Sequence, residues 1–246
     1  MNRPTLSVVT VVRNGADRIA RTVESVLAQD YPSIDYVVVD GASTDGTLEK
    51  LETGPWRGRI ARVLSEPDRG IYDAMNKGLQ LATGEFVLFM NCGDVFASAT
   101  AVSAVMADVK SGGDQIVFAR WARRVAGRAD LICAPDLASG RFNHQAVVYS
   151  RSIHRWHGDY LSVPGLSTAD YMFFATLLDS PDVAYRTSDA LLAVIDVDGM
   201  SAGLQTFSQK YAADYLLGRT SRLRLAAVLL LHPVYWALKR RLRGRP

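Results

Sequence analysis

The stretch from Ser65 to Asp94 constrains the fold more than any other part of the chain, because it places a polar loop, an amphipathic helix and a buried strand in succession. Apolar residues recur at helical spacing from Ile71 to Ala82, which predicts a helix with one buried face. The continuous apolar run from Phe86 to Met90 is typical of a parallel strand covered on both faces. Polar residues ending at Asp94 follow this strand, at the position where open α/β sheets bind ligands.

The residues before Ser65 repeat the alternation of strand and helix. Two β-rich apolar runs, Leu6 to Val12 and Tyr36 to Val39, flank a helical pattern from Asp17 to Gln29, and Arg62 to Leu64 is interpreted as a third short strand. This order predicts an α/β fold with a mostly parallel sheet and right-handed crossovers.

Charge and cysteine content narrow the function classes. The formal net charge is +3, but eight Lys or Arg and no acid follow Leu217. The residues up to Leu217 therefore carry a net charge of about −5 and are not expected to bind nucleic acid. Cys92 and Cys133 give neither a disulfide framework nor a metal-ligand spacing. The apolar run from Leu6 to Val12 is too short for a signal peptide, so we expect a cytoplasmic chain.

Polar side chains follow three of the predicted strands. Asn14, Asp40 and Asp94 come after apolar runs, and a parallel sheet would gather them along one edge. Carboxylates gathered in one crevice repel each other unless a cation or a ligand rich in hydrogen-bond donors lies between them. The alternative interpretation is that these acids cap the helices that follow.

Several motifs resemble those of the family 2 glycosyltransferases, in particular enzymes of bacterial exopolysaccharide synthesis of the colanic-acid type. In chain order they are RNG, VVVDGASTDGT, SEPDRGIYDAMNKG, ATGE and NCGD, followed by the less specific FNHQAVVYSR, STADYMF and DGMS. The resemblance implies a GT-A fold, which is a Rossmann-like, mostly parallel sheet flanked by helices. It also implies a nucleotide-diphosphate sugar as donor and inversion at the anomeric carbon.

The same resemblance implies roles for individual residues. The residue matching Asp40 holds the nucleobase, and Asp94 matches the last acid of a motif that binds Mn²⁺ or Mg²⁺. NCGD keeps only that acid, but one carboxylate suffices if the diphosphate supplies other ligands. For His144, a buried structural role is as good an interpretation as ligand binding. The residues matched to donor binding besides Asp40 are Asn14, Asp45, Arg69, Asp73, Asn76 and His144.

Asp170 is the predicted catalytic base. An acceptor hydroxyl must lose its proton as it attacks the anomeric carbon, so a carboxylate is required within hydrogen-bond reach. Asp170 lies in STADYMF, which resembles the acceptor half of the family. It also follows Ser167 and Thr168, where an acid in the first turn of a helix interacts favourably with the helix dipole. The two roles are compatible.

The residues after about Ala202 change character. The uncharged segment from Leu225 to Leu238 would span about 21 Å as a helix, short of the roughly 30 Å hydrocarbon core of a membrane. Basic residues flank this segment, and Pro233, Tyr235 and Trp236 lie within it. We therefore predict that it lies on an anionic membrane surface. The alternative is a helix packed on the body or on a second subunit.

These interpretations give a domain scheme and a function. Residues 1–205 are predicted to form one GT-A domain, with a nucleotide-sugar-binding half at 1–110 and an acceptor half at 111–205. Residues 206–246 are predicted to form an amphipathic, membrane-associating tail.

The expected acceptor is a glycan, or a polyprenyl-diphosphate-linked glycan, at the inner face of the plasma membrane. The alternative is a non-catalytic, membrane-tethered nucleotide-sugar-binding module. A nicotinamide dehydrogenase is disfavoured, because RNGADR lacks the G-x-G-x-x-G turn.

Overall fold

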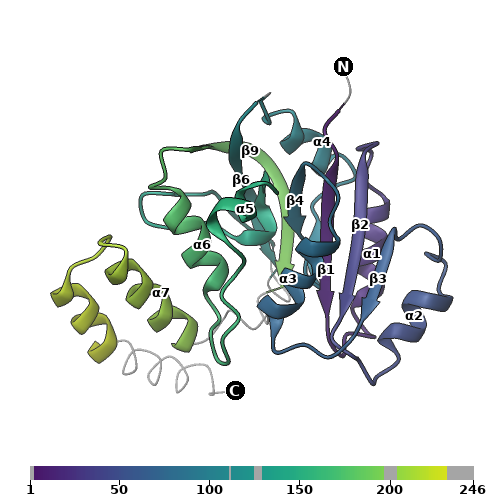
Figure 1. The fold of residues 1–246 in the computed structure, drawn as a ribbon, viewed down its shortest axis with the longest axis horizontal. Coiled ribbons are helices and arrows are strands. Elements are labelled where there is room, and N and C mark those ends of the chain that lie inside the picture. Colours follow the sequence, from purple (N-terminus) through teal and green to yellow (C-terminus); the bar gives the residue numbers. More distant parts are fainter. Residues whose placement is uncertain (1–2, 111, 125–128, 197–203, 232–246) are drawn as a thin grey trace. The chain divides into compact units, whose positions relative to one another are not determined.

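The computed structural model describes residues 3–110, 112–124, 129–196 and 204–231. The chain divides into two compact units. One is formed by Met1–Ser162 with Ser180–Val197, and the other by Val163–Asp179 with Asp198–Pro246. Figure 1 shows the elements of both.

The first part of the larger unit contains the predicted alternation of strands and helices. Its elements are β1 (Leu6–Val12), α1 (Ile19–Leu27), β2 (Ile34–Asp40), α2 (Thr47–Thr53), β3 (Arg62–Ser65), α3 (Ile71–Leu81) and β4 (Phe86–Phe89). The four strands are parallel neighbours in the order β3-β2-β1-β4. The predicted parallel α/β sheet is confirmed, and the carboxyl ends of these strands share one edge.

The rest of this unit extends the sheet with strands of mixed direction. The further elements are β5 (Val95–Phe96), α4 (Ala101–Met106), β6 (Asp114–Arg124), β7 (Leu131–Cys133), the 3₁₀ helix η1 (His144–Ala146), β8 (Val147–Ser150), α5 (Ile153–His157) and β9 (Val183–Asp196). β8 is antiparallel to both β4 and β6, whereas β9 is parallel to β6. The sheet order is β3-β2-β1-β4-β8-β6-β9-β5, with β7 paired to β6.

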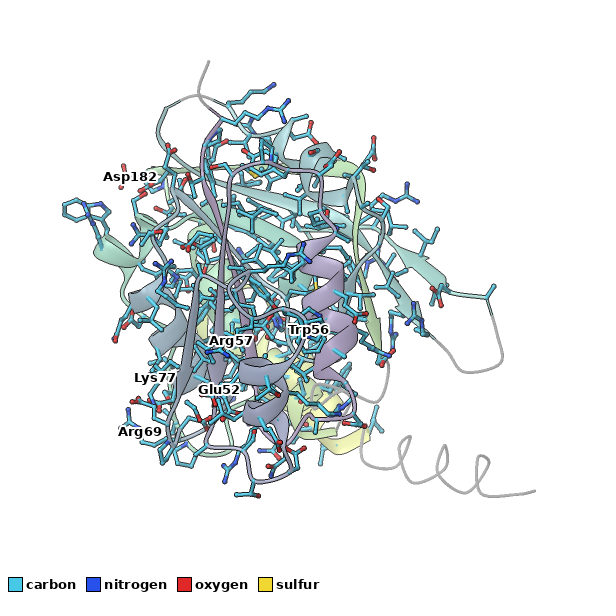
Figure 2. All side chains as sticks on the ribbon, turned by 90° about the vertical axis from the view of Figure 1, so that its right-hand side faces the viewer. Glu52, Trp56, Arg57, Arg69, Lys77 and Asp182 are labelled. Atoms are coloured by element: carbon cyan, nitrogen blue, oxygen red, sulfur yellow. The ribbon has the colours of Figure 1, made fainter. Side chains whose placement is uncertain are left out.

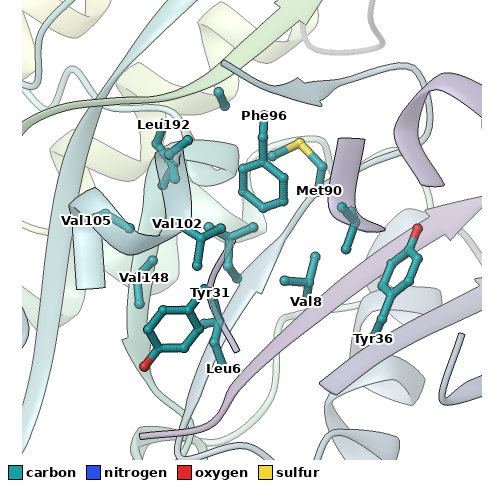
Figure 3. Packing of buried hydrophobic residues seen from close by; sticks show 14 of the residues in the cluster. Leu6, Val8, Tyr31, Tyr36, Met90, Phe96, Val102, Val105, Val148 and Leu192 are labelled. Carbon is teal, nitrogen blue, oxygen red and sulfur yellow. The ribbon is translucent and has the colours of Figure 1, made fainter. Parts of the chain in front are cut away.

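The core lies between the sheet and the helices on its two faces. Side chains alternate between the faces of a strand, so Val8 and Val9 of β1 point in opposite directions. Val8 belongs to the apolar cluster with Met90 and Phe96 (Figure 3). On the other face, a Cβ on Gly78 of α3 would lie 2.4 Å from Val9 Cγ1. The glycine therefore allows α3 to approach β1 closely.

The smaller unit is built on α6 (Ala169–Leu177) and α7 (Leu204–Leu216). Tyr171 of α6 donates a hydrogen bond to the carboxylate of Asp214 on α7, and Lys210 Nζ lies 3.1 Å from the same carboxylate. Most of α7 falls within residues 206–246, the predicted tail, yet it is joined to α6 by these contacts. The predicted boundary at residue 205 stays a prediction.

A helix over residues 222–231 follows α7 and exposes most of its apolar side chains, whereas Leu225 and Val228 are half-buried. Leu223 is 84% exposed and Leu230 is 74% exposed. Among the residues that the structure describes, no helix combines the length and the apolar character needed to cross a membrane. Pro233, Tyr235 and Trp236, as well as the DGMS motif at 198–201, lie outside the described residues.

Candidate active site

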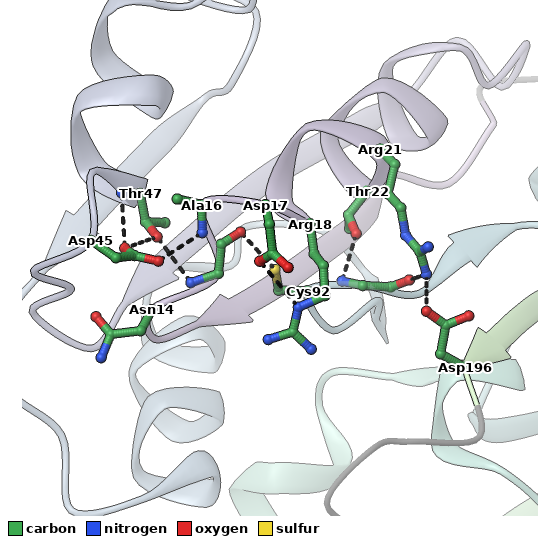
Figure 4. A network of polar contacts seen from close by, with 12 residues as sticks. Asn14, Ala16, Asp17, Arg18, Arg21, Thr22, Asp45, Thr47, Cys92 and Asp196 are labelled. Atoms are coloured by element: carbon green, nitrogen blue, oxygen red, sulfur yellow. Dashed lines mark hydrogen bonds and ion pairs between the residues drawn. The ribbon is translucent and has the colours of Figure 1, made fainter.

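Asn14 and Asp45 join the loops that follow β1 and β2. Asn14 Oδ1 accepts a hydrogen bond from the Thr44 N–H at 2.9 Å, and the Asn14 N–H donates to Ser43 Oγ at 2.7 Å. Asp45 Oδ2 accepts from the Ala16 N–H at 2.9 Å (Figure 4). The structure thus brings together these two residues, which were predicted to lie around the nucleoside, and both connect the two loops through hydrogen bonds. Their contact with a nucleoside stays a prediction.

Asp40 is buried at the end of β2, and its carboxylate accepts three hydrogen bonds. The donors are the Ser43 N–H at 3.0 Å, the Ser43 hydroxyl, and the Ser65 hydroxyl at 2.7 Å. A carboxylate has about four acceptor positions, so these three bonds fill most of them, and contact of Asp40 with a nucleobase stays a prediction. A Cβ on Gly41 would lie 2.1 Å from Asp68 Oδ2. The loop after β3 therefore reaches the same corner as the loop after β2.

Two residues at this corner have a left-handed backbone although neither is glycine. They are Asn14, with φ 51°, and Ala42, with φ 54°. Such conformations cost about 1–3 kcal/mol each and cluster at functional sites. Their positions just beyond β1 and β2 make this corner the candidate nucleoside site.

The loop after β3 and helix α3 carry the other residues predicted to bind the donor. Asp73 Oδ1 accepts from the Arg69 guanidinium at 2.8 Å, and this bond together with one from the Arg69 N–H lowers the pKa of Asp73. The Arg69 side chain is 79% exposed (Figure 2). Asn76 Oδ1 accepts from the Tyr160 N–H at 3.0 Å, and its Nδ2 donates to the Tyr160 carbonyl at 2.8 Å. The Asn76 amide thus holds the chain at Tyr160, and a role in donor binding stays a prediction.

Asp94 is buried in the turn after β4. Its Oδ2 accepts a hydrogen bond from Gln145 Nε2 at 2.7 Å, and its Oδ1 accepts from the Asp196 N–H at 3.2 Å. Burial raises the pKa of this carboxyl, while the two hydrogen bonds and the nearby His144 act in the opposite direction. Both donors come from segments distant in sequence, η1 and the end of β9.

Arg21 is a neighbour of this turn that the sequence analysis missed. Its guanidinium donates to the Gly93 carbonyl and to the carboxylate of Asp196 (Figure 4). The contact joins α1 to the end of β9. Because Arg21 and Asp196 are 175 positions apart, no local sequence pattern indicated the pair.

His144 and Gln145 of η1 both face the turn after β4. His144 Nε2 lies 3.0 Å from Asn91 Nδ2, and Gln145 donates to Asp94. The structure therefore brings the predicted residue His144 to the side of Asp94. Gln145 was not predicted, although the motif FNHQ contained the signal.

The residues near Asp94 fit a divalent cation that shares its ligands with a substrate. Among the described residues, no cluster of three His, Cys, Asp or Glu side chains is arranged to hold a metal ion. Two buried amide oxygens, Asn91 Oδ1 and Gln145 Oε1, accept no hydrogen bond from any described residue. Carboxylate and amide oxygens are the ligands preferred by Mg²⁺ and Mn²⁺. Asp94 with these two residues could therefore hold such an ion if a diphosphate supplied the remaining ligands.

Asp170 lies in the other compact unit, in the first turn of α6. The N-cap residue Thr168 makes no capping bond with its side chain. Instead, Gln209 of α7 accepts hydrogen bonds at its Oε1 from the Ser167 N–H at 2.9 Å and from Ser167 Oγ at 3.0 Å. The start of α6 is thus held by α7. The roles of Asp170 as base and as helix-dipole residue both stay predictions.

Comparisons with known proteins agree with this architecture. An uncharacterized glycosyltransferase of Mycobacterium tuberculosis is 39% identical over 111 residues, which are 45% of this chain and 42% of the relative. The chain thus spans less than half the length of that relative. A PGL/p-HBAD biosynthesis glycosyltransferase of Mycobacterium bovis is 28% identical over 204 residues, covering 78% of this chain and 77% of the relative.

Two solved structures share the fold. Staphylococcus aureus TarS 1–349 in complex with UDP-GlcNAc has a TM-score of 0.69 at 19% identity, over 86% of this chain and 65% of that chain. The mannosyltransferase PcManGT of Pyrobaculum calidifontis, in complex with GDP-Man and Mn²⁺, has a TM-score of 0.66 at 19% identity, over 93% of this chain and 70% of that chain. The predicted GT-A fold is confirmed. A sequence model of glycosyl transferase family 2 matches residues 7–134, more than half of the chain. The chain belongs to glycosyl transferase family 2.

Proposed function

We propose that this chain is an inverting glycosyltransferase that moves a sugar from a nucleotide-diphosphate sugar to a lipid-linked glycan acceptor in exopolysaccharide or cell-surface polysaccharide synthesis. The observation that carries the proposal is the buried carboxylate of Asp94 in the turn after β4, at the sheet edge that also carries Asn14 and Asp40. Family membership supports it, as do relatives named for PGL/p-HBAD and teichuronic acid biosynthesis.

The donor is expected to lie along the carboxyl edge of the parallel strands. Asp40 is the residue proposed to hold the nucleobase, and the exposed guanidinium of Arg69 suits a phosphate. A divalent cation at Asp94 would neutralise charge on the departing nucleoside diphosphate. The complexes of TarS with UDP-GlcNAc and of PcManGT with GDP-Man and Mn²⁺ support a nucleotide sugar and a cation as a class.

Asp170 is the proposed base. The acceptor hydroxyl oxygen attacks the anomeric carbon from the face opposite the leaving group, and its proton passes to the carboxylate of Asp170. The bond from the anomeric carbon to the diphosphate oxygen breaks, and the nucleoside diphosphate leaves with the electron pair. Because the attack comes from the opposite face, the configuration is inverted. Asp170→Asn should lower the transfer rate about 10²- to 10⁴-fold and leave donor affinity unchanged. A variant that keeps its turnover but melts at a lower temperature would instead support the helix-dipole role.

The proposal is tested by incubating the full chain with UDP-, GDP- and dTDP-sugars, with and without Mn²⁺. Binding is followed by thermal shift and turnover by release of the nucleoside diphosphate. A transferase should be stabilised by one nucleotide class and should release the diphosphate from that donor. Stabilisation without release under any condition would favour the alternative, a non-catalytic nucleotide-sugar-binding module.

We also propose that the carboxyl-terminal segment places the enzyme on an anionic membrane that carries a lipid-linked acceptor. The helix over residues 222–231 exposes its leucines beside Arg222 and Arg224, which are also exposed. A basic residue near such a surface contributes about 1 kcal/mol. Arg219 is not available for this role, because its guanidinium donates to the Ala175 carbonyl at 2.8 Å and contacts Asp179 at 3.0 Å.

The test compares the full chain with a version ending at Ser221, which keeps Arg219 in place. The full chain should cosediment with liposomes that contain anionic lipid, and high salt should weaken the association by screening the basic residues. The shortened chain should bind the donor but no longer cosediment. Equal cosedimentation of both chains would show that the segment is only a packing helix.

A further inference from the structure

Two amide oxygens beside Asp94 are buried without a hydrogen-bond donor from any described residue. They are Oδ1 of Asn91 and Oε1 of Gln145. Gln145 as a whole is only 7% exposed. Buried carbonyl oxygens are nearly always paired, because an unpaired acceptor loses its solvation without compensation. The two oxygens are therefore available to a water molecule or to a bound group that supplies donors or positive charge.

The contacts of the two amides explain why these oxygens are left over. Gln145 Nε2 donates to Asp94 Oδ2 at 2.7 Å, and the reversed amide would place Oε1 against a carboxylate. Asn91 Nδ2 lies 3.0 Å from His144 Nε2, so Asn91 Oδ1 points away from His144. Asn91 and Asp94 belong to one turn, closed by a bond from the Asp94 N–H to the Asn91 carbonyl at 3.0 Å. The two amides are therefore both linked to Asp94, Gln145 through its side chain and Asn91 through the shared turn.

The two amides and the Asp94 carboxylate all present oxygen acceptors, and one of the three groups is an acid. This combination suits a hard divalent cation such as Mn²⁺ or Mg²⁺. A neutral hydroxyl ligand could pair with one of the oxygens but would add no positive charge beside the buried carboxylate. We propose that Asn91 Oδ1 and Gln145 Oε1 coordinate the divalent cation together with Asp94. The two amides then take the place of the further carboxylate that NCGD lacks.

This inference rests on the proposed function, because the donor diphosphate supplies the remaining ligands. The proposed ligand set also determines how tightly the free protein should bind the cation. A protein ligand set with one negative charge attracts a cation less than a set with two or three, so the ion should bind weakly to the free protein. A nucleoside diphosphate adds negative oxygens, so it should tighten Mn²⁺ binding, and Mn²⁺ should tighten nucleotide binding by the same factor.

The experiment measures Mn²⁺ affinity of the full chain by titration calorimetry and by the paramagnetic resonance signal of free Mn²⁺. It is done without nucleotide and with UDP or GDP. Asn91→Leu removes one oxygen and should weaken Mn²⁺ binding about 10- to 100-fold, a loss typical of disturbed metal sites. Asn91→Asp and Gln145→Glu each add a carboxylate and should strengthen it. Gln145→Glu should also destabilise the metal-free protein, and Mn²⁺ should restore its melting temperature.

Gln115→Glu is the matched control. Gln115 is 2% exposed, and both ends of its amide are paired, through the Lys110 N–H at 2.9 Å and the Lys110 carbonyl at 2.7 Å. The substitution should destabilise the protein, but Mn²⁺ affinity should stay native and Mn²⁺ should not restore the melting temperature.

Three results would overturn the assignment. They are native Mn²⁺ affinity in folded Asn91→Leu, native affinity in both Asn91→Asp and Gln145→Glu, or no Mn²⁺ binding by the native chain with either nucleotide. In each of these cases, release of nucleoside diphosphate from a donor by the native chain would leave the proposed function standing. The reverse outcome, the expected Mn²⁺ shifts without turnover of any donor, would support the cation site and refute the transferase.

Discussion

Gln209 on α7 should control the start of α6, and with it the position of Asp170. Its Oε1 accepts from the Ser167 N–H at 2.9 Å and from Ser167 Oγ at 3.0 Å, and its Nε2 donates to the Gly165 carbonyl at 2.7 Å. Gln209→Leu replaces the amide by an apolar group of similar size and removes these three bonds as well as a longer one from Thr168 Oγ1 at 3.5 Å. The segment 165–168 would keep the contact of Ser167 Oγ with Thr206 Oγ1 at 2.8 Å and the bond from Gln205 to Gly165.

The magnitude follows from which groups lose a partner. The Gly165 carbonyl keeps a second hydrogen bond, from Gln205 Nε2 at 2.7 Å, so the Ser167 N–H bears most of the loss. A buried donor left without a partner costs about 1–3 kcal/mol. Ser167 is only half-buried, so water can compensate in part, and we expect about 1–2 kcal/mol. Opening of the segment should become about 5- to 30-fold more frequent.

Hydrogen exchange of the amides in residues 165–172 measures this opening directly. The transfer rate should fall along with the exchange protection, whereas donor affinity should change little, because the loops proposed to bind the donor belong to the other unit. Gln205→Leu is the control, since it removes only the second bond to Gly165 and should have a smaller effect. Equal exchange in the two variants would refute the idea that the Gln209 amide positions the start of α6.

Two further predictions concern buried acids of the larger unit. Asp94→Asn should weaken Mn²⁺-dependent donor binding, measured by calorimetry, while the circular dichroism spectrum stays native, and unchanged binding would contradict the cation assignment. Burial alone would raise the pKa of Asp35, but hydrogen bonds from Ser7 and Thr83 and the charge of Arg62 outweigh it and lower the pKa. Because the lowered pKa belongs to the folded state, the stabilisation is present above about pH 4 and is lost as the pH falls through the folded value. The stability advantage of native protein over Asp35→Asn in urea should therefore shrink from about pH 7 to pH 3, and a constant advantage would contradict this.

The parallel half of the sheet was predictable because its signals are local. Continuous apolar runs bounded by polar turns marked β1, β2 and β4, and the helical periodicity after Gly70 marked α3. Asp40 and Asp94 could be placed at one edge because parallel strands share their carboxyl ends. Register and strand order in the other half depend on pairings such as β6 with β9, which join residues about 70 positions apart. No local pattern specifies such a pairing.

The residues that escaped prediction are those whose role depends on what another segment brings to them. Gln145 is one of many neutral amides in the sequence, and Asp196 acts on Asp94 through its backbone N–H, which any residue other than proline provides. Arg21 has meaning only after folding has brought the end of β9 to α1.

The partners of Asp94 also bear on how the chain divides its functions. Burial disfavours the charged form of a carboxylate unless donors are supplied, and the turn that carries Asp94 supplies none to its side chain. The donors come from Gln145 and Asp196, 51 and 102 positions later in the chain. Both lie within residues 111–205, the predicted acceptor half. Arg21, from the predicted donor half, in turn holds Asp196. A chain cut near residue 110 would therefore lack Gln145 and Asp196, the two groups that favour the ionised form of Asp94. If Asp94 holds the donor-bound cation as proposed, the segments after residue 110 contribute to the donor site, so the two predicted halves would not function separately.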